Sequence, residues 1–345
     1  MTQQKEIQIN NETSLPAVML RMITGLWGTQ IIHVAAKLGI ADLLNDGPKN
    51  SAELAKSTGV NAGALYRLLR ALASLGIFAE RDTGFFEMTP LAEYLRTGVP
   101  GSLRAAAIMW GEDWHYRPWG NLLHSVKTGQ TGFSHVFGEE IFTYLARNRE
   151  AAKVFNVALS DAAFTDNAAI AAAYDFSRAG CVVDVGGGHG SLIAAILKAY
   201  PAAQGILFDQ PSVVAGAEKL LEAEGVASRC EIAGGDFFES VSPGGDVYML
   251  KYVVHDWDDD RALKILRSLH RAMRAKSRIL LIENLIRPGN EPSFGKLMDI
   301  TMLVMAAGRE RTIREYRALY AAAGFELTNI IPTQSTLSLI EGVKP

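Results

Sequence analysis

Residues 181–191, CVVDVGGGHGS, decide the fold of this 345-residue chain. Five residues typical of a buried strand run into a loop with four glycines, and a run of helix-forming residues begins at Ser191. Glycine allows the backbone to turn tightly and to approach a ligand closely. A strand, a glycine loop and a helix in this order are typical of an α/β domain that holds a ligand above the loop.

Strands and helices alternate downstream of this loop. Four more apolar runs predict strands within 205–210, 229–235, 246–254 and 278–284, and helices are expected at 191–199, 213–224 and 260–274. Such alternation predicts a parallel sheet with helices on both faces. The second half of the chain is therefore expected to be α/β.

The first half is predicted to be almost entirely helical. Apolar residues recur at helical spacing across 15–40, but Arg21, His33 and Lys37 interrupt them, so a membrane span is not expected. That apolar face is expected to be buried either in a partner subunit or within its own domain. Residues 51–95 predict a helix, a second helix and a hairpin around Asp82-Thr83-Gly84, which together make a winged helix.

The charge balance argues against a nucleic-acid-binding protein. Lys and Arg number 34 against 37 Asp and Glu, for a net charge of -3, and the second winged-helix segment offers only Arg67 and Arg70 as bases. The two cysteines, Cys181 and Cys230, cannot form a disulfide framework. Residues 1–14 are polar and lack the apolar core of a signal peptide, so a cytoplasmic location is expected.

Acidic residues and one histidine follow the predicted strands at their carboxyl ends, where open parallel sheets bind ligands. Asp209 is suited to accept hydrogen bonds from ribose hydroxyls, and Asp236 with Phe237 suits an adenine amino group and ring face. His255 follows the fourth strand and is expected to face the same crevice. A nicotinamide dinucleotide and S-adenosylmethionine both remain open as ligands of the loop, as do purely structural roles for these residues.

Six motifs in order carry a family resemblance: DVGGGHGS, FDQPSVV, GGDFF, LKYVVHDWDD, LIEN and AGRERT. Together they resemble the S-adenosylmethionine-dependent O-methyltransferases of the caffeate and hydroxyindole type, whose bacterial relatives methylate hydroxyls of secondary metabolites. The resemblance implies a Rossmann-like class I methyltransferase domain and a winged-helix dimerisation domain in a homodimer. The expected divisions are 1–100 for dimerisation, 101–170 for a helical linker beside the substrate pocket, and 171–345 for the methyltransferase domain.

The resemblance also implies roles for individual residues. S-adenosyl-L-methionine is expected to contact a set of residues along the strand ends: Asp184, Gly186, Gly188, Asp209, Asp236, Phe237 and Lys251. His255 is expected to be the general base, flanked by Glu283 and Glu310, with no metal ion. The aromatic acceptor is expected to meet Asp256, Met302, Met305, Phe155 and Trp110. Ala307 stands where the family often has a glycine.

Three alternatives remain open at this stage. The fold and cofactor could serve an altered reaction, such as a hydroxylation or decarboxylation, although relatives of that kind typically have the base altered. A winged-helix DNA-binding regulator and a nicotinamide-dependent dehydrogenase are the other two. For His255, Glu283 and Glu310, the structural alternatives are a buried histidine and ion pairs with Arg309, Arg311 or Arg314.

Overall fold

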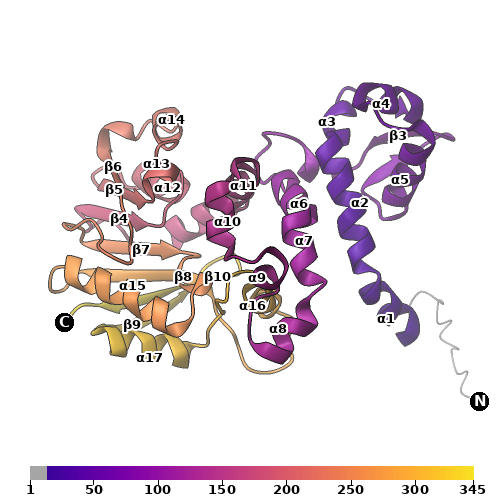
Figure 1. Ribbon diagram of the computed structural model, residues 1–345. Helices are drawn as coiled ribbons and strands as arrows, with labels where there is room; N and C mark the ends of the chain where they lie inside the picture. Colours follow the sequence, from indigo (N-terminus) through magenta and orange to yellow (C-terminus); the bar gives the residue numbers. More distant parts are fainter. Residues whose placement is uncertain (1–13) are drawn as a thin grey trace, which may run out of the picture. The chain divides into compact units, whose positions relative to one another are not determined.

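A seven-stranded sheet forms the centre of the second half of the chain in the computed structural model, which describes residues 14–345 apart from the side chains of residues 160–165 (Figure 1). The strand order is β6-β5-β4-β7-β8-β10-β9. The strands are β4 Cys181–Val185, β5 Gln204–Asp209, β6 Cys230–Gly234, β7 Val247–Lys251, β8 Arg278–Asn284, β9 Glu326–Pro332 and β10 Leu337–Val343. The strands β6, β5, β4, β7 and β8 are parallel, whereas β10 runs antiparallel to both β8 and β9. The Rossmann-like α/β prediction is confirmed, with a final antiparallel hairpin that the sequence did not predict.

Helices cover both faces of this sheet, because side chains alternate between the faces along each strand. Val183 and Tyr248 pack with α15 (Asp259–Ala272) and α17 (Ile313–Ala323) on one face. Val182 and Met249 pack on the other face with three helices: α11 Arg149–Ala173, α12 Ser191–Ala199 and α14 Glu218–Ala223. In open parallel sheets, ligands bind at the carboxyl ends of the strands, so the loops that follow these strands form the candidate site.

The prediction of one continuous helix at 213–224 is wrong. The chain forms α13 (Pro211–Val214), turns, and resumes as α14. Gly216 lies in the turn, where an added Cβ would be 3.3 Å from Nε2 of His189 in the glycine loop. A side chain at this position would therefore have to displace the His189 ring by a few tenths of an ångström.

The N-terminal unit ends at Glu112, and the second compact unit is Asp113–Pro345. The first contains α1 Leu15–Ile23, α2 Gly25–Leu38, α3 Ile40–Leu43, α4 Ser51–Thr58, α5 Ala62–Ser74, α6 Arg104–Gly111 and a small sheet in the order β1-β3-β2, with β1 Lys49–Asn50, β2 Phe78–Glu80 and β3 Phe85–Met88. Asn50 and Glu53 form a capping box at the start of α4. The predicted winged helix is therefore present. The role assigned to 101–170 as a separate linker stays a prediction.

The remaining described helices belong to the second unit. They are α7 Asp113–Trp119, α8 Leu122–Thr128, α9 Gly132–Phe137, α10 Ile141–Arg147 and α16 Phe294–Met305, with short 3-10 turns at Ala92–Leu95 (η2, in the first unit), Ala227–Arg229 (η3) and Val254–Asp256 (η4). The turn η4 directly follows β7 and carries His255.

The first helix of the described chain buries none of its residues. Ile23 and Trp27 are each 70% exposed, and Leu15 is 84% exposed. Within residues 14–345, no single helix is long and apolar enough to cross a membrane, and only α1 and α2, bent by 46°, would pass on length and composition when taken together. The polar segment considered for a targeting signal lies, except for Ser14, outside the described residues.

Candidate active site

The glycine loop after β4 combines tight packing with open space. Gly186 has φ +71°, and a Cβ there would come within 2.7 Å of Val253, while a Cβ on Gly187 would meet Leu207 and Asp184 at 2.6–2.7 Å. Gly188 has φ +62°, yet a Cβ there would meet no atom within 4 Å. Gly186 and Gly187 are therefore needed because a side chain would clash there. Gly188 leaves open space beside the loop for a ligand.

Asp184 lies buried beneath this loop. Burial raises the pKa of its carboxyl to about 7, although the positive charge of Lys251 acts in the opposite direction. Its Oδ2 atom is buried and has no hydrogen-bond partner. Such an atom is costly in a ligand-free protein, which makes Asp184 a candidate for a polar ligand group or for holding a proton.

Two more acids follow at the ends of β5 and β6. The Asp209 carboxylate accepts hydrogen bonds from the backbone N–H groups of Gly188 (2.8 Å) and Gln210 (2.6 Å). Asp236 is exposed and accepts one from the N–H of Phe238 at 2.8 Å. Phe237 packs edge-on against Trp257 with ring centroids 6.2 Å apart. Each carboxylate has more acceptor sites than these hydrogen bonds use.

Lys251 ends β7 and meets two residues that the sequence did not reveal. Its Nζ donates to Oδ1 of Asn167 over 2.8 Å and lies 3.8 Å from Oδ2 of Asp166. Asn167, which is buried, in turn donates from Nδ2 to Oγ of Ser191 at 3.1 Å. Burial lowers the pKa of the Lys251 ammonium to about 8, despite the attraction of Asp166 and Asp184. The helix α11 is thus linked to the start of α12 through Asn167.

His255 is surrounded by carboxylates, as the sequence predicted. Its Nδ1 lies 2.9 Å from Oε1 of Glu310 and 3.8 Å from Oε2 of Glu283, and its Nε2 lies 3.5 Å from Oδ1 of Asp256. Glu283 Oε1 also accepts the backbone N–H of Val254 at 3.0 Å. All of His255, Glu283 and Glu310 are buried. The structure therefore brings the three predicted catalytic residues together.

The electrostatics of this cluster favour bound protons. Burial lowers the pKa of His255, but the charges of Glu283, Asp256 and Glu310 outweigh it and raise the pKa to about 10. Burial, opposed by the charge of His255, raises the pKa of Glu283 to about 8. Burial likewise raises the pKa of Asp256 to about 6. The ligand-free cluster is expected to hold an imidazolium at neutral pH.

The segment that carries Glu310 is held against the His255 turn by its backbone. The N–H of Arg309 donates to the carbonyl oxygen of His255 at 2.8 Å, and the N–H of Glu310 donates to Oδ1 of Asp299 at 2.9 Å. A Cβ on Gly308 would lie 1.9 Å from the His255 carbonyl oxygen. Ala307, in contrast, is exposed and has φ +60°. The missing family glycine therefore leaves a strained alanine but not a blocked contact.

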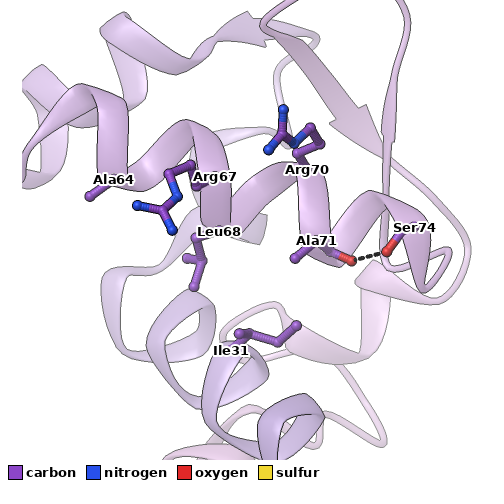
Figure 2. A pocket seen from close by; sticks show the side chains of 7 residues that line it. All are labelled: Ile31, Ala64, Arg67, Leu68, Arg70, Ala71 and Ser74. Atoms are coloured by element: carbon purple, nitrogen blue, oxygen red, sulfur yellow. Dashed lines mark hydrogen bonds between the residues drawn. The ribbon is translucent and has the colours of Figure 1, made fainter. Parts of the chain in front are cut away.

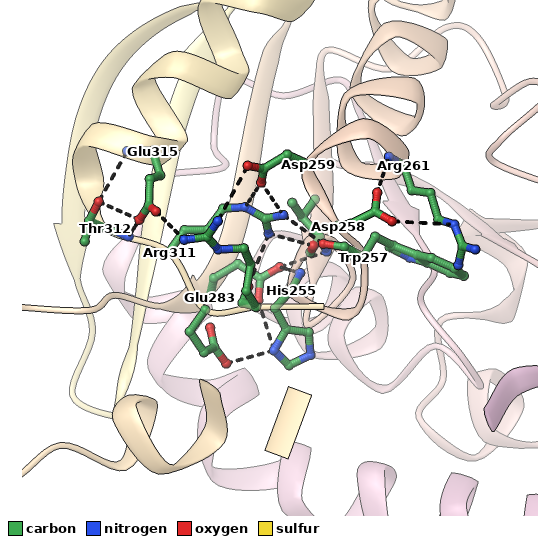
Figure 3. A network of polar contacts seen from close by, with 12 residues as sticks. His255, Trp257, Asp258, Asp259, Arg261, Glu283, Arg311, Thr312 and Glu315 are labelled. Carbon is green, nitrogen blue, oxygen red and sulfur yellow. Dashed lines mark hydrogen bonds and ion pairs between the residues drawn. The ribbon is translucent and has the colours of Figure 1, made fainter. Parts of the chain in front are cut away.

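Arg311 also holds the turn that carries His255. Its fully buried guanidinium donates to the carbonyl oxygens of Val254 (2.9 Å) and Trp257 (2.8 Å) and pairs with Asp259 (Figure 3). Arg309 pairs with Asp259 and Glu315. The ion pairs of these arginines are thus made with other acids and not with Glu310, which faces His255.

The predicted acceptor residues are distributed over several elements. Met302 and Met305 are buried near the end of α16, and Phe155 on α11 contacts Trp114 and Phe142, whose ring stacks on Trp257 at 5.4 Å. A cavity of about 290 Å³ lies beside Met305, Trp257, Phe142, Gln130 and Thr131. Trp110 belongs to the N-terminal unit, at the end of α6, and its role stays a prediction.

The groups of His255, Glu283 and Glu310 lie within 4.8 Å of one another, a spacing that also suits a metal ion. The 2.9 Å separation of Nδ1 and Oε1 is the length of an ordinary hydrogen bond. The prediction of no metal stays a prediction.

The winged helix presents little that resembles a nucleic-acid surface. A cavity of about 600 Å³ is lined by one face of α5, which supplies Arg67 and Arg70, and by Ile31 of α2 (Figure 2). Arg70 also lies over the ring of Tyr66 at 5.5 Å. Two arginines beside Ile31 and Leu68 do not form the basic stripe that phosphate contacts require.

Family comparison settles the class of the protein. A model of the O-methyltransferase domain matches residues 119–326, and a model of the O-methyltransferase dimerisation domain matches residues 20–98. The chain belongs to the O-methyltransferase family. It is an S-adenosylmethionine-dependent methyltransferase with an N-terminal dimerisation domain, as the six motifs predicted.

Relatives of this methyltransferase act on different acceptor atoms. It is 50% identical over 329 residues to a phenazine O-methyltransferase of Lysobacter antibioticus, covering 95% of this chain and 96% of the relative. It is 34% identical to the 8-amino-8-demethylriboflavin N,N-dimethyltransferase of Streptomyces davaonensis, with 90% of each chain covered. The crystal structure of human N-acetylserotonin methyltransferase with S-adenosylmethionine has a TM-score of 0.89 at 28% identity, covering 97% of this chain and 99% of that one.

The residues around the glycine loop fit this cofactor. Gly188 leaves open space, and Asp209 retains lone pairs that suit ribose hydroxyls. Three acids beside one lysine suit a cofactor with a positively charged sulfonium better than a pyrophosphate, which would be repelled.

Proposed function

We propose that this enzyme methylates a hydroxyl group of a planar aromatic secondary metabolite, with His255 as the general base. The observation that carries the proposal is the 2.9 Å contact between Nδ1 of His255 and Glu310. Because Nδ1 donates to that carboxylate, Nε2 is left as the proton acceptor. A histidine in this state typically contributes about 10²–10⁴-fold to a reaction that needs a proton removed.

The cluster has a defined task for each residue in the proposed reaction. Bound S-adenosylmethionine supplies an electrophilic methyl group on a positively charged sulfur. Nε2 of His255 takes the hydroxyl proton as the oxygen attacks, and Glu310 and Glu283 stabilise the imidazolium that results. Asp256, with Oδ1 3.5 Å from Nε2, accepts a hydrogen bond from a donor next to the reacting hydroxyl.

The raised pKa of His255 is compatible with this task because the cofactor is cationic. A positive charge brought near an imidazolium disfavours its proton and lowers its pKa. A bound sulfonium therefore shifts the cluster from its protonated form toward the proton-accepting form.

An aromatic acceptor is supported by the residues of α16 and by the aromatic residues beside the neighbouring cavity. Met302 and Met305 provide flexible thioethers that accommodate flat rings. The stacked pair Phe142 and Trp257 borders a cavity of about 290 Å³, which is close to the lower limit for small-molecule sites. A nitrogen acceptor is the second candidate, because the 34% identical riboflavin-type relative is an N,N-dimethyltransferase.

We further propose that the enzyme is a homodimer, supported by the dimerisation-domain match and by the exposed apolar side chains of α1 and α2. Their exposure exceeds what a monomer usually leaves in contact with water. A cytoplasmic location, expected from the sequence, stays a prediction.

Product analysis tests the proposed function. The purified enzyme is incubated with methyl-labelled S-adenosylmethionine and a matched panel of planar phenols and aromatic amines. We expect an O-methylated product and a loss of about 10²-fold or more in kcat for His255→Ala. The control is His270→Ala, on α15, where the ring packs edge-on against Phe325.

Three other outcomes of the product analysis would contradict parts of the proposal. Unchanged turnover in His255→Ala removes the base assignment. Methylation of amines alone moves the acceptor atom to nitrogen. A product without a new methyl group shows the altered reaction considered from the sequence.

A further inference from the structure

The order of the strands fixes the direction in which an extended cofactor crosses the site. Asp236 ends β6 and Asp209 ends β5, and these are the proposed adenine and ribose contacts. The glycine loop follows β4, and Lys251 ends β7, the next strand in the sheet. A cofactor that lies along this edge from adenine to ribose brings its amino-acid tail to the region between β4 and β7.

Lys251 is restrained in this region by a neutral partner. Its side chain is only 10% exposed, and its Nζ is 2.8 Å from Oδ1 of Asn167. Asn167 is itself 4% exposed, and its orientation is fixed by the second hydrogen bond to Ser191, at the first turn of α12. An ammonium has three donors, so one bond to Asn167 leaves two for other groups.

We propose that Asn167 is a positioning residue that holds the Lys251 ammonium ready for the carboxylate of the cofactor's amino-acid tail. The amide is suited to this role because it orients the ammonium without neutralising it. A carboxylate at the same place would cancel the charge that attracts the tail. Asp166, at 3.8 Å, is the only ion-pair partner of Lys251 among the described side chains, and its distance from Nζ is longer than that of Asn167; the ammonium also lies over the Tyr252 ring, 5.7 Å from its centroid.

Lysine needs such support because its side chain is long and flexible. Both its rotamer freedom and the cost of burying its charge weaken a lysine that binds alone. Burial does lower the pKa of Lys251, to about 8, so a nearby carboxylate on the cofactor would restore full protonation. A hydrogen bond to a charged group is typically strong enough to change affinity by about 10-fold or more.

Two ligands separate this role from a purely structural one. S-adenosylhomocysteine carries the amino-acid tail, whereas 5′-methylthioadenosine has the same nucleoside and sulfur without it. Binding of both is measured by calorimetry on the full-length enzyme. The proposal rests on the cofactor placement proposed above, but the assay needs neither the acceptor nor His255.

We expect Asn167→Ala to raise the Kd of S-adenosylhomocysteine about 10-fold. Asn167→Asp, which is nearly isosteric and adds a negative charge, is expected to raise it further, by about 100-fold. The Kd of 5′-methylthioadenosine should change less than about 2-fold in both variants. The matched control is Asn148→Ala, before the first turn of the same helix, where Nδ2 donates to the Tyr144 carbonyl oxygen at 2.8 Å.

A kinetic comparison gives a second readout. Asn167→Ala should raise KM for S-adenosylmethionine with little change in kcat, since the reacting groups lie elsewhere. Equal losses for the two ligands, or unchanged binding of S-adenosylhomocysteine, would overturn the positioning role. Failure of the parent enzyme to bind either ligand would instead overturn the cofactor placement, and the inference with it.

Discussion

The backbone N–H of Arg309 donates to the carbonyl oxygen of His255 over 2.8 Å. This bond joins the turn that carries His255, the proposed base, to the segment that carries its carboxylate partner, Glu310. Gly308 lies at the point of closest approach, where a Cβ would be 2.4 Å from the carbonyl carbon of Asp256. Because the atoms it would meet belong to the backbone, they cannot move aside as a side chain could.

Substitutions at the neighbouring positions Ala307 and Gly308 are therefore expected to have opposite effects on stability. Gly308→Ala should lower kcat/KM at least about 10-fold and destabilise the fold by about 1–3 kcal/mol, as overpacking does. Ala307→Gly should stabilise it by about 0.5–1 kcal/mol, since the left-handed φ of +60° is relaxed. Denaturant unfolding and steady-state kinetics measure both, and equal behaviour of the pair would contradict the geometry.

Glu310→Gln should shift the pH dependence of the reaction. The base acts only when deprotonated, so kcat/KM for S-adenosylmethionine, which reports the enzyme before the cofactor binds, is expected in the parent to rise with pH toward the raised pKa of His255, about 10. Loss of the Glu310 charge lowers that pKa, so the rise should occur at lower pH. The plateau should also fall, because the imidazolium is less stabilised.

The control for this profile is Glu222→Gln, an exposed glutamate on α14. Its profile should coincide with that of the parent. An unshifted profile in Glu310→Gln would mean that His255 is not the group that titrates in the rate.

Cofactor binding should release protons from the enzyme. A sulfonium near the protonated His255 cluster lowers the pKa of the imidazolium, whereas the neutral sulfur of S-adenosylhomocysteine does not. Calorimetry in buffers of different ionisation enthalpy should therefore show proton release with S-adenosylmethionine at pH 7–8, and clearly less with S-adenosylhomocysteine. In His255→Ala the difference between the two ligands should disappear, and its persistence would assign the proton to another group.

The apolar surface of α1 and α2 should control the oligomeric state. Sedimentation of the parent is expected to show a dimer, and Ile23→Glu with Trp27→Glu should produce a monomer, because both side chains are 70% exposed and apolar. Ile232→Glu on β6, an exposed apolar residue of the second unit, is the control. Dimers that persist in the double variant would place the interface elsewhere.

The parallel core of the sheet was predictable because each of its strands is a short apolar run that ends at a glycine or a polar residue. The hairpin of β9 and β10 was not, since Glu341 and Gly342 interrupt β10, and β9 is an edge strand with several exposed residues. Glu341 is tolerated there because it pairs with Arg278 and accepts from Tyr174.

The residues of the candidate site were likewise only partly predictable from the sequence. Asp209, Asp236, Lys251 and His255 were predictable because parallel strands end at one edge of the sheet. Asn167 was not, because it reaches Lys251 from 84 residues away along the chain and lies on a helix without a motif of its own. Contacts of that kind depend on how helices pack across the sheet, which residue spacing does not encode.

The bond from the Glu310 N–H to Asp299 has a consequence for protein engineering. Asp299 lies on α16, the same helix that carries Met302 and Met305. Substitutions of these methionines that displace α16 are therefore expected to displace Glu310 as well, through its backbone bond to Asp299. If the proposed roles hold, the choice of acceptor and the placement of Glu310 depend on the same helix, and we expect a redesign that keeps Asp299 to retain more activity than one that varies it.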